Sequence, residues 1–370
     1  MYIFLTFCTL LSFFFLQQQT KNGNMKKYFS YSVLPIFLYS LTYGFREGWG
    51  QDYDVYNALF LGDFRLDLEN YEALFRFLIK TLRLISDSSL VLFVFVAAAF
   101  IFSYIFLLKE NRDVLGLALS IFYLLSAYQA SNLVRFFLAL SIAYIGIDLI
   151  LQKKWLLSIL ILSASVFIHA GIIIFIVMAL LLVKFKLFFN MKYNIILYFI
   201  SAVVSIENVQ ELFGNVIYRM LSSLDFGNLQ LVKYADRDIV NNYILGTTWG
   251  EIEKSIFYLF FNFMFGLLFI YLGHRLINKM PNIKNIGFYY QIGVWGVVFG
   301  NIAANTEILY RVSIAFVYLS SLVCAYIIKY YRRLRVNHFI FALFLLSVIY
   351  MCFFSVKQIY SGFDVLYLWN

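Results

Sequence analysis

Residues 89–108 read SLVLFVFVAAAFIFSYIFLL, twenty consecutive residues without a charged side chain. A helix that crosses the hydrocarbon core of a bilayer needs about 20 mostly apolar residues. Runs of this kind recur along the whole chain, in which 63% of the 370 residues are hydrophobic and 13% are charged. Soluble domains are about 45–50% apolar and about 25% charged. The sequence therefore excludes an ordinary soluble protein and predicts an integral membrane protein.

Twelve apolar runs of about this size predict an all-α polytopic membrane protein with about 12 transmembrane helices. No stretch is polar enough for a soluble domain of ordinary size, so residues 1–370 are expected to form a single integral membrane domain. The seventh run is short, which predicts a kink, a thin local bilayer or continuation into residues 184–189. The predicted spans are 2–17, 28–45, 89–108, 114–130, 134–151, 155–170, 171–183, 193–206, 255–273, 286–303, 312–328 and 338–355.

Basic residues are concentrated on one side of the predicted bundle. One set of alternate loops carries a net charge of +14 and the other set −5, which together make the formal charge of +9. Because Lys and Arg accumulate in cytoplasmic loops, the first set is assigned to the cytoplasm and both termini to the outside. Residues 1–16 are also compatible with a signal-like segment, whose removal would move only the N-terminus.

Two outer segments are longer than a passive connection requires. Residues 46–88 open with a glycine-rich turn and continue as an amphipathic stretch, which predicts a helix along the outer membrane interface. Within it, Glu72 and Arg76 are spaced for an i,i+4 ion pair. Residues 207–254 are expected to form a large outer (periplasmic) loop, with an apolar stripe at helical spacing over residues 212–221.

Four ionisable side chains stand at the outer ends of predicted spans. Arg46 ends the second span, Arg135 begins the fifth, His169 ends the sixth and Arg311 begins the eleventh. Charges at membrane depth are costly and commonly mark functional sites. A single arginine near a helix end can instead extend toward headgroups or pair with a nearby acid, and a histidine there can simply be interfacial. Three arginines at one membrane level favour a shared site over these separate explanations.

An acidic turn follows the second span. It reads Gly50-Gln51-Asp52-Tyr53-Asp54-Val55-Tyr56, and a helix that begins near Gly50 would place Asp52, Tyr56 and Phe60 on one face. Asp52 and Asp54 have the Asp-x-Asp spacing that some glycosyltransferases use for a divalent metal. Two acids at this spacing are common by chance, so no metal is predicted.

The three cysteines lie inside apolar runs. Cys8, Cys324 and Cys352 have neither Cys-x-x-Cys nor Cys/His spacing, so neither a disulfide nor a zinc site is predicted. Their expected role is packing or lipid contact. No cofactor is expected, and the only large surplus of positive charge is explained by topology, so no nucleic-acid partner is expected either.

The motifs at these outer positions resemble the EpsG family of bacterial exopolysaccharide proteins, which belong with the Wzy-type O-antigen and capsule polymerases. Family members commonly have Gln directly after the second arginine, where this chain has Phe136. The similarity covers most of residues 25–330. Its elements here are Arg46 before Gly50-Gln51-Asp52-Tyr53-Asp54-Val55-Tyr56, then Arg135 with Ala139 and Ala143, then Lys153-Lys154, then Phe167-Ile168-His169, and finally Arg311.

The resemblance implies polymerisation of oligosaccharide repeat units on the outer face of the bacterial inner membrane, by a multi-pass protein resembling the GT-C-like multispan glycosyltransferases. A growing glycan on undecaprenyl pyrophosphate would be transferred to a newly flipped lipid-linked unit, and lipid pyrophosphate would leave. The product would be O-antigen, capsule or exopolysaccharide. The active site would face the periplasm or exterior.

The resemblance also assigns expected roles to the outer side chains. Planar guanidinium groups bind phosphate oxygens bidentately, so Arg46, Arg135 and Arg311 are the candidates for binding pyrophosphate. Asp52 is the expected base for the acceptor hydroxyl, with His169 as the alternate base or its orienting partner. Secondary substrate contacts are expected from Tyr56 and Asp54.

Two other classes of function remain as alternatives. A flippase for lipid-linked oligosaccharides would also be apolar and polytopic, but alternating access predicts charged positions near the bilayer midplane, whereas the polar groups here are at the outer ends. An outer-face O-antigen ligase would use similar Arg and His chemistry. Besides undecaprenyl-pyrophosphate-linked oligosaccharides and the lipid bilayer, the expected partners are a chain-length regulator and a flippase.

Overall fold

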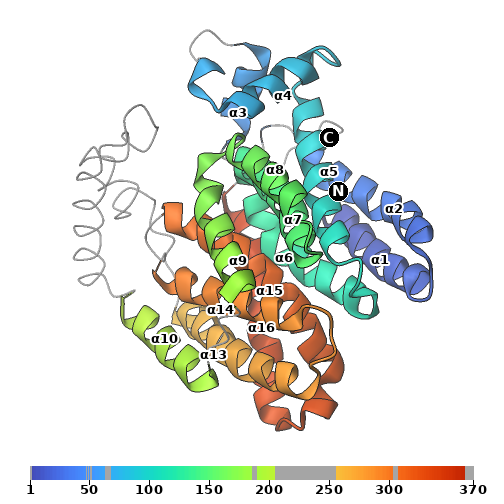
Figure 1. The fold of residues 1–370 in the computed structure, drawn as a ribbon. Helices are drawn as coiled ribbons and strands as arrows, with labels where there is room; N and C mark the ends of the chain where they lie inside the picture. Colours follow the sequence, from blue (N-terminus) through green and yellow to red (C-terminus); the bar gives the residue numbers. More distant parts are fainter. Residues whose placement is uncertain are drawn as a thin grey trace.

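The computed structural model describes residues 2–46, 48, 50, 52–62, 68–185, 190–204, 256–302 and 307–362. These residues form helices joined by short turns, without a strand in the described ranges. The predicted loop 207–254, its apolar stripe 212–221 and residues 186–189 lie outside the described residues. Figure 1 shows long helices packed as a bundle, with two short helices covering one end.

Fourteen α-helices and three single-turn 3₁₀ helices make up the described chain. The elements are α1 (Tyr2–Thr20), α2 (Met25–Gly44), α3 (Tyr53–Leu61), η1 (Leu68–Asn70), α4 (Ala73–Arg83), α5 (Leu90–Leu107), η2 (Arg112–Val114), α6 (Leu115–Asn132), α7 (Val134–Leu151), α8 (Trp155–Val166), η3 (Ala170–Ile172), α9 (Ile173–Phe185), α10 (Met191–Val204), α13 (Ile256–Lys279), α14 (Ile286–Ile302), α15 (Glu307–Leu334) and α16 (His338–Gly362).

Each of the twelve predicted runs falls on a helix. Among the described residues, seven helices are long and apolar enough to cross a bilayer, namely α1, α5, α6, α7, α13, α15 and α16. Helices α8, α9 and α10 are apolar but have only 12, 13 and 14 residues, or roughly 18–21 Å at 1.5 Å per residue. The protein is therefore a multi-pass helical membrane protein, and the count of twelve spans stays a prediction.

The start of α1 and the last turns of α16 are hydrogen-bonded to α2 and α6 toward the end of the bundle that carries α3 and α4. At the start of α1, the hydroxyl of Tyr2 lies 3.2 Å from that of Tyr43 near the end of α2. In α16, Ser355 Oγ donates to the carbonyl of Leu125 in α6 at 3.0 Å. Following the predicted orientation, we call this the outer end of the bundle and the opposite one the inner end.

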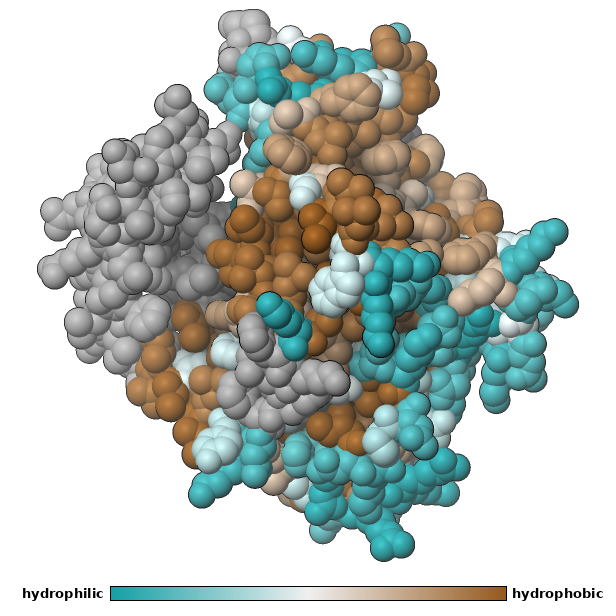
Figure 2. Space-filling model, viewed as in Figure 1, coloured by the Kyte–Doolittle hydropathy of each residue, from teal (hydrophilic) through white to brown (hydrophobic). Residues whose placement is uncertain are grey.

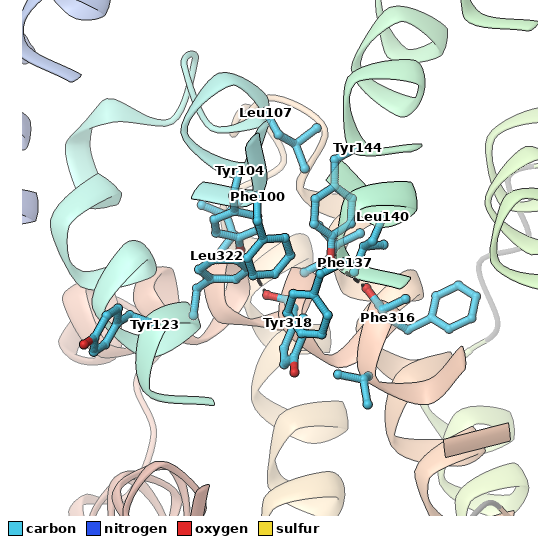
Figure 3. Packing of buried hydrophobic residues seen from close by; sticks show 14 of the residues in the cluster. Phe100, Tyr104, Leu107, Tyr123, Phe137, Leu140, Tyr144, Phe316, Tyr318 and Leu322 are labelled. Atoms are coloured by element: carbon cyan, nitrogen blue, oxygen red, sulfur yellow. Dashed lines mark hydrogen bonds between the residues drawn. The ribbon is translucent and has the colours of Figure 1, made fainter. Parts of the chain in front are cut away.

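Buried tyrosines join the central helices. In the cluster drawn in Figure 3, the hydroxyl of Tyr104 on α5 donates to the carbonyl of Tyr318 on α15 at 3.0 Å. Tyr144 on α7 makes the same kind of bond to the carbonyl of Ala315 at 3.1 Å. The ring of Tyr104 stacks on Phe122 of α6 at 3.7 Å between centroids. The buried hydroxyls of Tyr104 and Tyr144 thus each have an acceptor, and α5, α6 and α7 are fixed against α15.

The middle of the surface is apolar. Figure 2 shows a broad hydrophobic region on this face between polar areas at its upper and lower ends. On α8, Leu156 is 77% exposed and Leu160 61% exposed. Such a wide apolar surface is unfavourable in water but matches the acyl chains of a bilayer. The surface therefore agrees with the composition in indicating a membrane environment.

The inner end is held by buried and half-buried ion pairs. Lys109, just after α5, pairs with Asp148 on α7, and both side chains are 8% exposed. Asp113 in η2 accepts hydrogen bonds from Tyr326 at 2.8 Å and from Lys329 at 3.0 Å, both on α15. One short connection between α5 and α6 therefore ties together α7 and α15.

Breaking the inner ion pair should destabilise the fold. We expect Asp148→Asn to lower the free energy of unfolding by about 3 kcal/mol, because it leaves the Lys109 ammonium buried without its counter-charge. Thermal unfolding in detergent measures the loss. The control is Glu110→Gln, which removes a surface contact with Lys284 at 3.6 Å and should cost under about 1 kcal/mol. Equal stability of Asp148→Asn and wild type would contradict this account.

Candidate functional site

A glycine-dependent turn connects α2 to α3. Gly50 has φ +106°, and a Cβ at this position would lie 2.1 Å from the carbonyl oxygen of Ser131 in α6. Only glycine accommodates both this backbone conformation and this approach. The carbonyl of Gly50 then accepts the N–H of Tyr53 at 3.1 Å, in the first turn of α3. The turn thus presses against the end of α6 and places Asp52 at the start of α3.

Helix α3 has the predicted face. Tyr56 and Phe60, one turn apart, are 7% and 2% exposed. Asp52 precedes the helix without a capping bond from its side chain and is partly buried. Asp54, in the first turn of α3, is exposed. The carboxylates of Asp52 and Asp54 therefore have different surroundings. The secondary role of Asp54 stays a prediction.

A clash at Gly50 should disturb this turn. We expect Gly50→Ala to lower the free energy of unfolding by about 2 kcal/mol, because both the backbone and the start of α3 must shift. Gly48→Ala is the matched control: Gly48 also has positive φ, at +63°, but a Cβ there would meet nothing within 4 Å. Thermal unfolding of both variants in detergent measures the difference. Equal effects in both would show that close packing on Ser131 is unimportant.

Arg46 lies beneath the turn and is 2% exposed. Its Nη1 donates to the carbonyl of Ala130 at 3.2 Å, and its guanidinium lies 5.0 Å from the ring centre of Phe93. Its Nε has no hydrogen-bond partner among the described residues. The side chain also lines a small cavity of about 10 Å³ together with Tyr39 and Val134. Arg46 is thus a buried cation below the surface of the site.

Arg135, in the first turn of α7, is held by the outer segment. Its Nη1 donates to Oε2 of Glu72 at 2.5 Å. Its guanidinium lies 5.0 Å from the ring centre of Tyr71 and 6.0 Å from that of Phe75. Its Nε has no hydrogen-bond partner among the described residues. Arg135 therefore has a fixed carboxylate partner and donor capacity left for a ligand.

His169 stands in the break between α8 and η3. This break comes earlier than the predicted boundary at residues 170–171, because α8 already ends at Val166. The ring's Nδ1 lies 3.7 Å from Oε1 of Glu72, and Phe136 contacts the ring at 5.8 Å between centroids. Phe136, which stands where members of the resembled family commonly have Gln, thus packs on His169.

Glu72 is the member of the site that the sequence reasoning missed. The predicted Glu72–Arg76 pair is wrong, because Arg76 pairs with Glu69 instead. Besides Arg135, Glu72 accepts the backbone N–H of Ala170 at 3.1 Å through Oε1. Helical spacing pointed to Arg76, and no local signal identified partners in other helices.

The ionisation of Glu72 follows from these contacts. Partial burial alone would raise its pKa, but the neighbouring His169 ring, the charge of Arg135 and the Ala170 N–H outweigh burial and lower the pKa to about 2. Burial lowers the pKa of His169, although the Glu72 carboxylate opposes this shift. At neutral pH the pair is therefore a carboxylate beside a neutral imidazole.

Asp52 lies within the field of all three arginines. Burial raises its pKa, and the charges of Arg311, Arg46 and Arg135 oppose that shift. Arg311, at the start of α15, also acts on His169. The predicted arginines come from α15, the end of α2 and the start of α7, yet the charges of all three act on a single carboxylate.

Tyr56 belongs to the same group. Burial raises its pKa to about 12. The charge of Asp52 raises this pKa as well, whereas the charges of Arg135 and Arg311 lower it.

No cluster of three or more His, Cys, Asp or Glu side chains suited to a metal occurs in the described part of the chain. The three cysteines are free, with Cys324 and Cys352 buried in the packing.

The fold and the site together define a multi-pass helical membrane protein with three guanidinium groups, two carboxylates and an imidazole gathered at one end of its bundle. The chain belongs to the EpsG family, whose family model matches residues 29–367. This is a family of Wzy-type polymerase-like membrane proteins, as the motifs predicted. No curated protein and no solved structure matches the chain. The resemblance to GT-C-like glycosyltransferases stays a prediction.

Proposed function

We propose that this protein joins undecaprenyl-pyrophosphate-linked oligosaccharide repeat units into O-antigen, capsule or exopolysaccharide. The observation that supports the proposal is that the charges of Arg46, Arg135 and Arg311, which come from three separate helices, all act on Asp52. A cationic site around a carboxylate suits a reaction in which a pyrophosphate leaves and a hydroxyl attacks. Membership of the EpsG family, which is associated with polymerase-like glycosyltransferase activity, supports the same reaction.

The proposed step is a substitution at the anomeric carbon of the growing glycan. A hydroxyl oxygen of the incoming lipid-linked unit forms a bond to this carbon, and the bond from the carbon to the pyrophosphate oxygen breaks. The electron pair leaves with undecaprenyl pyrophosphate, and the hydroxyl proton passes to the base. No oxidant or other co-reactant is needed, since the pyrophosphate bond already activates the sugar.

The arginines divide the work according to their burial. Arg135 and Arg311 are half-buried and are the proposed direct ligands of the pyrophosphate oxygens. Arg46 is 2% exposed, so in this conformation it acts on the site through its charge from below. Preorganised cations in a water-poor site stabilise charge that develops on a leaving group, by about 3–4 kcal/mol per donor in mutational series.

Asp52 is the proposed base. Because burial raises its pKa, its carboxylate accepts a proton more readily than an exposed aspartate does. The surrounding arginines oppose this shift and favour the ionised form that a base requires. His169 remains the alternate base, since its imidazole is neutral and only one ring nitrogen, Nδ1, faces Glu72.

The proposed setting is the bacterial inner membrane, with the site facing the periplasm or exterior. The strongly basic loops belong to the inner end, as expected for the cytoplasmic side. A flippase that delivers the units and a regulator of chain length are the proposed protein partners. Both would act on the same lipid-linked substrate before or during polymerisation.

The test is polymer synthesis by the purified protein in vesicles that contain a synthetic lipid-linked repeat unit, read as a ladder of products on a gel. A ladder that grows with time supports the proposal. Transfer of single units to a final acceptor without a ladder would identify a ligase. In a deletion strain, accumulation of flipped single units supports a polymerase, whereas unflipped units would identify a flippase.

A further inference from the structure

Glu72 connects the outer segment to the bundle. It is the residue before α4, with an extended backbone (φ −61°, ψ 146°), and its side chain makes no capping bond to its own helix. The carboxylate instead reaches α7 and the α8–η3 junction through Arg135 and the Ala170 N–H. Close by, the N–H of Leu74 donates to the carbonyl of Phe167 at 3.1 Å. The start of α4 is thus attached to the bundle by side-chain and backbone bonds.

We propose that Glu72 is a positioning residue, which holds the Arg135 guanidinium in the orientation in which it meets the substrate. This inference rests on the proposed function. Arginine has a long, flexible side chain. If it is fixed before the substrate binds, no conformational entropy has to be lost to order it during the reaction. The Glu72 and Arg135 side chains are 16% and 18% exposed, so their pair is only partly screened by solvent.

The charges of the site distinguish positioning from binding. Three guanidinium groups and the carboxylates of Asp52 and Glu72 leave one net positive charge for an anionic pyrophosphate. Glu72 weakens that attraction, so its presence does not serve binding of the donor. What it supplies is a fixed geometry, since Arg135 contacts both the Glu72 carboxylate and the ring of Tyr71.

Glu72 also lies beside His169 and acts on it through its charge. The groups that act on this ring are Glu72 beside α4, Arg135 on α7 and Arg311 on α15. Nδ1 faces Glu72, while Nε2 lies 3.0 Å from the place that a Cβ on Gly171 would occupy. The ring is therefore enclosed by a carboxylate on one side and a glycine on the other. Loss of the carboxylate charge should lower the pKa of His169, because Glu72 is the group that raises it.

The central variant is Glu72→Gln, which keeps an oxygen acceptor but removes the charge. In the vesicle assay we expect kcat to fall at least 10-fold while KM for the lipid-linked donor stays equal or falls. The control is Glu69→Gln on the same segment, whose carboxylate pairs with Arg76 and Lys80 away from Arg135. This control should retain wild-type kcat and KM.

A double-variant cycle tests whether Glu72 acts through Arg135. If it does, Glu72→Gln combined with Arg135→Gln should be no slower than Arg135→Gln alone. NMR of protein with nitrogen-labelled histidine gives a readout independent of turnover. With only 3 histidines in the chain, His169→Asn assigns the signal. We expect the His169 pKa to be lower in Glu72→Gln than in wild type.

The outcomes separate the two proposals. A wild-type protein that makes no polymer from lipid-linked units overturns the proposed function. A polymerising wild type with a Glu72→Gln variant of equal kcat and equal His169 pKa overturns only the positioning role. Losses that multiply in the double variant, together with lowered thermal stability of Glu72→Gln, would also overturn it, because Glu72 would then act on the fold.

Discussion

Asp52→Asn is expected to slow polymer synthesis about 10³-fold, within the 10²–10⁴-fold that a general base contributes. The substitution preserves the shape of the side chain and removes its ability to accept the hydroxyl proton. It also removes a negative charge from the neighbourhood of three arginines, so binding of the anionic donor should not weaken. Single-turnover rates in vesicles measure the loss, and substrate titration shows whether it falls on kcat or KM.

The pH dependence provides a second measurement for Asp52. Burial raises the pKa of Asp52 above 3.8, its ordinary value, and the arginines only partly oppose this. A base must be deprotonated, so the wild-type rate should fall as pH drops through this raised pKa. The acid limb should disappear in Asp52→Asn. Asp87→Asn, at an exposed outer position before α5, is the matched control and should behave as wild type. An unchanged rate in Asp52→Asn would remove Asp52 from the mechanism.

Arg311→Ala is expected to lower kcat by about 10²–10³-fold, the usual cost of losing one preorganised donor to developing charge. Arg311 stands at the outer end of α15, where its charge acts on Asp52, Tyr56 and His169. Its loss should also weaken binding of the lipid pyrophosphate, so KM should rise. Initial rates over a range of donor concentrations separate the two effects.

The same helix contains the control for Arg311. Arg333 is an exposed arginine at the inner end of α15, so Arg333→Ala removes an equal charge from the opposite end of the bundle. This variant should keep wild-type kcat and KM once its amount in the membrane is matched. Similar losses in both variants would assign the effect to folding or insertion, and no loss in Arg311→Ala would remove it from the site.

Much of the fold was predictable because it depends on local pattern. The length of each apolar run sets where a helix can form, and all twelve predicted runs fall on helices. Boundaries were less predictable: the break before His169 follows the end of α8 at Val166, inside the predicted span 155–170. A run of apolar residues does not show where a turn interrupts it, because both halves face the same lipid.

The candidate site was likewise only partly predictable from the sequence. The motif around Asp52 and the arginines at span ends were evident because charged side chains are conspicuous in apolar sequence. Glu72 was misassigned to Arg76, its neighbour by helical spacing, although its ion pair joins residues 63 positions apart. An acid with a plausible local partner carries no sign that a distant arginine is closer in space.

The amino-acid sequence by itself determined that this protein lies in a membrane, where its helices form and which end of the bundle carries the basic loops. These properties depend on the overall composition and on short stretches of sequence. Only the tertiary structure decided that Arg46 is buried below the site, that Arg311 reaches the field of Asp52 and that Glu72 holds Arg135. The physical reason is that the partner of a charge is chosen by how helices pack, and packing brings together residues that no local pattern relates.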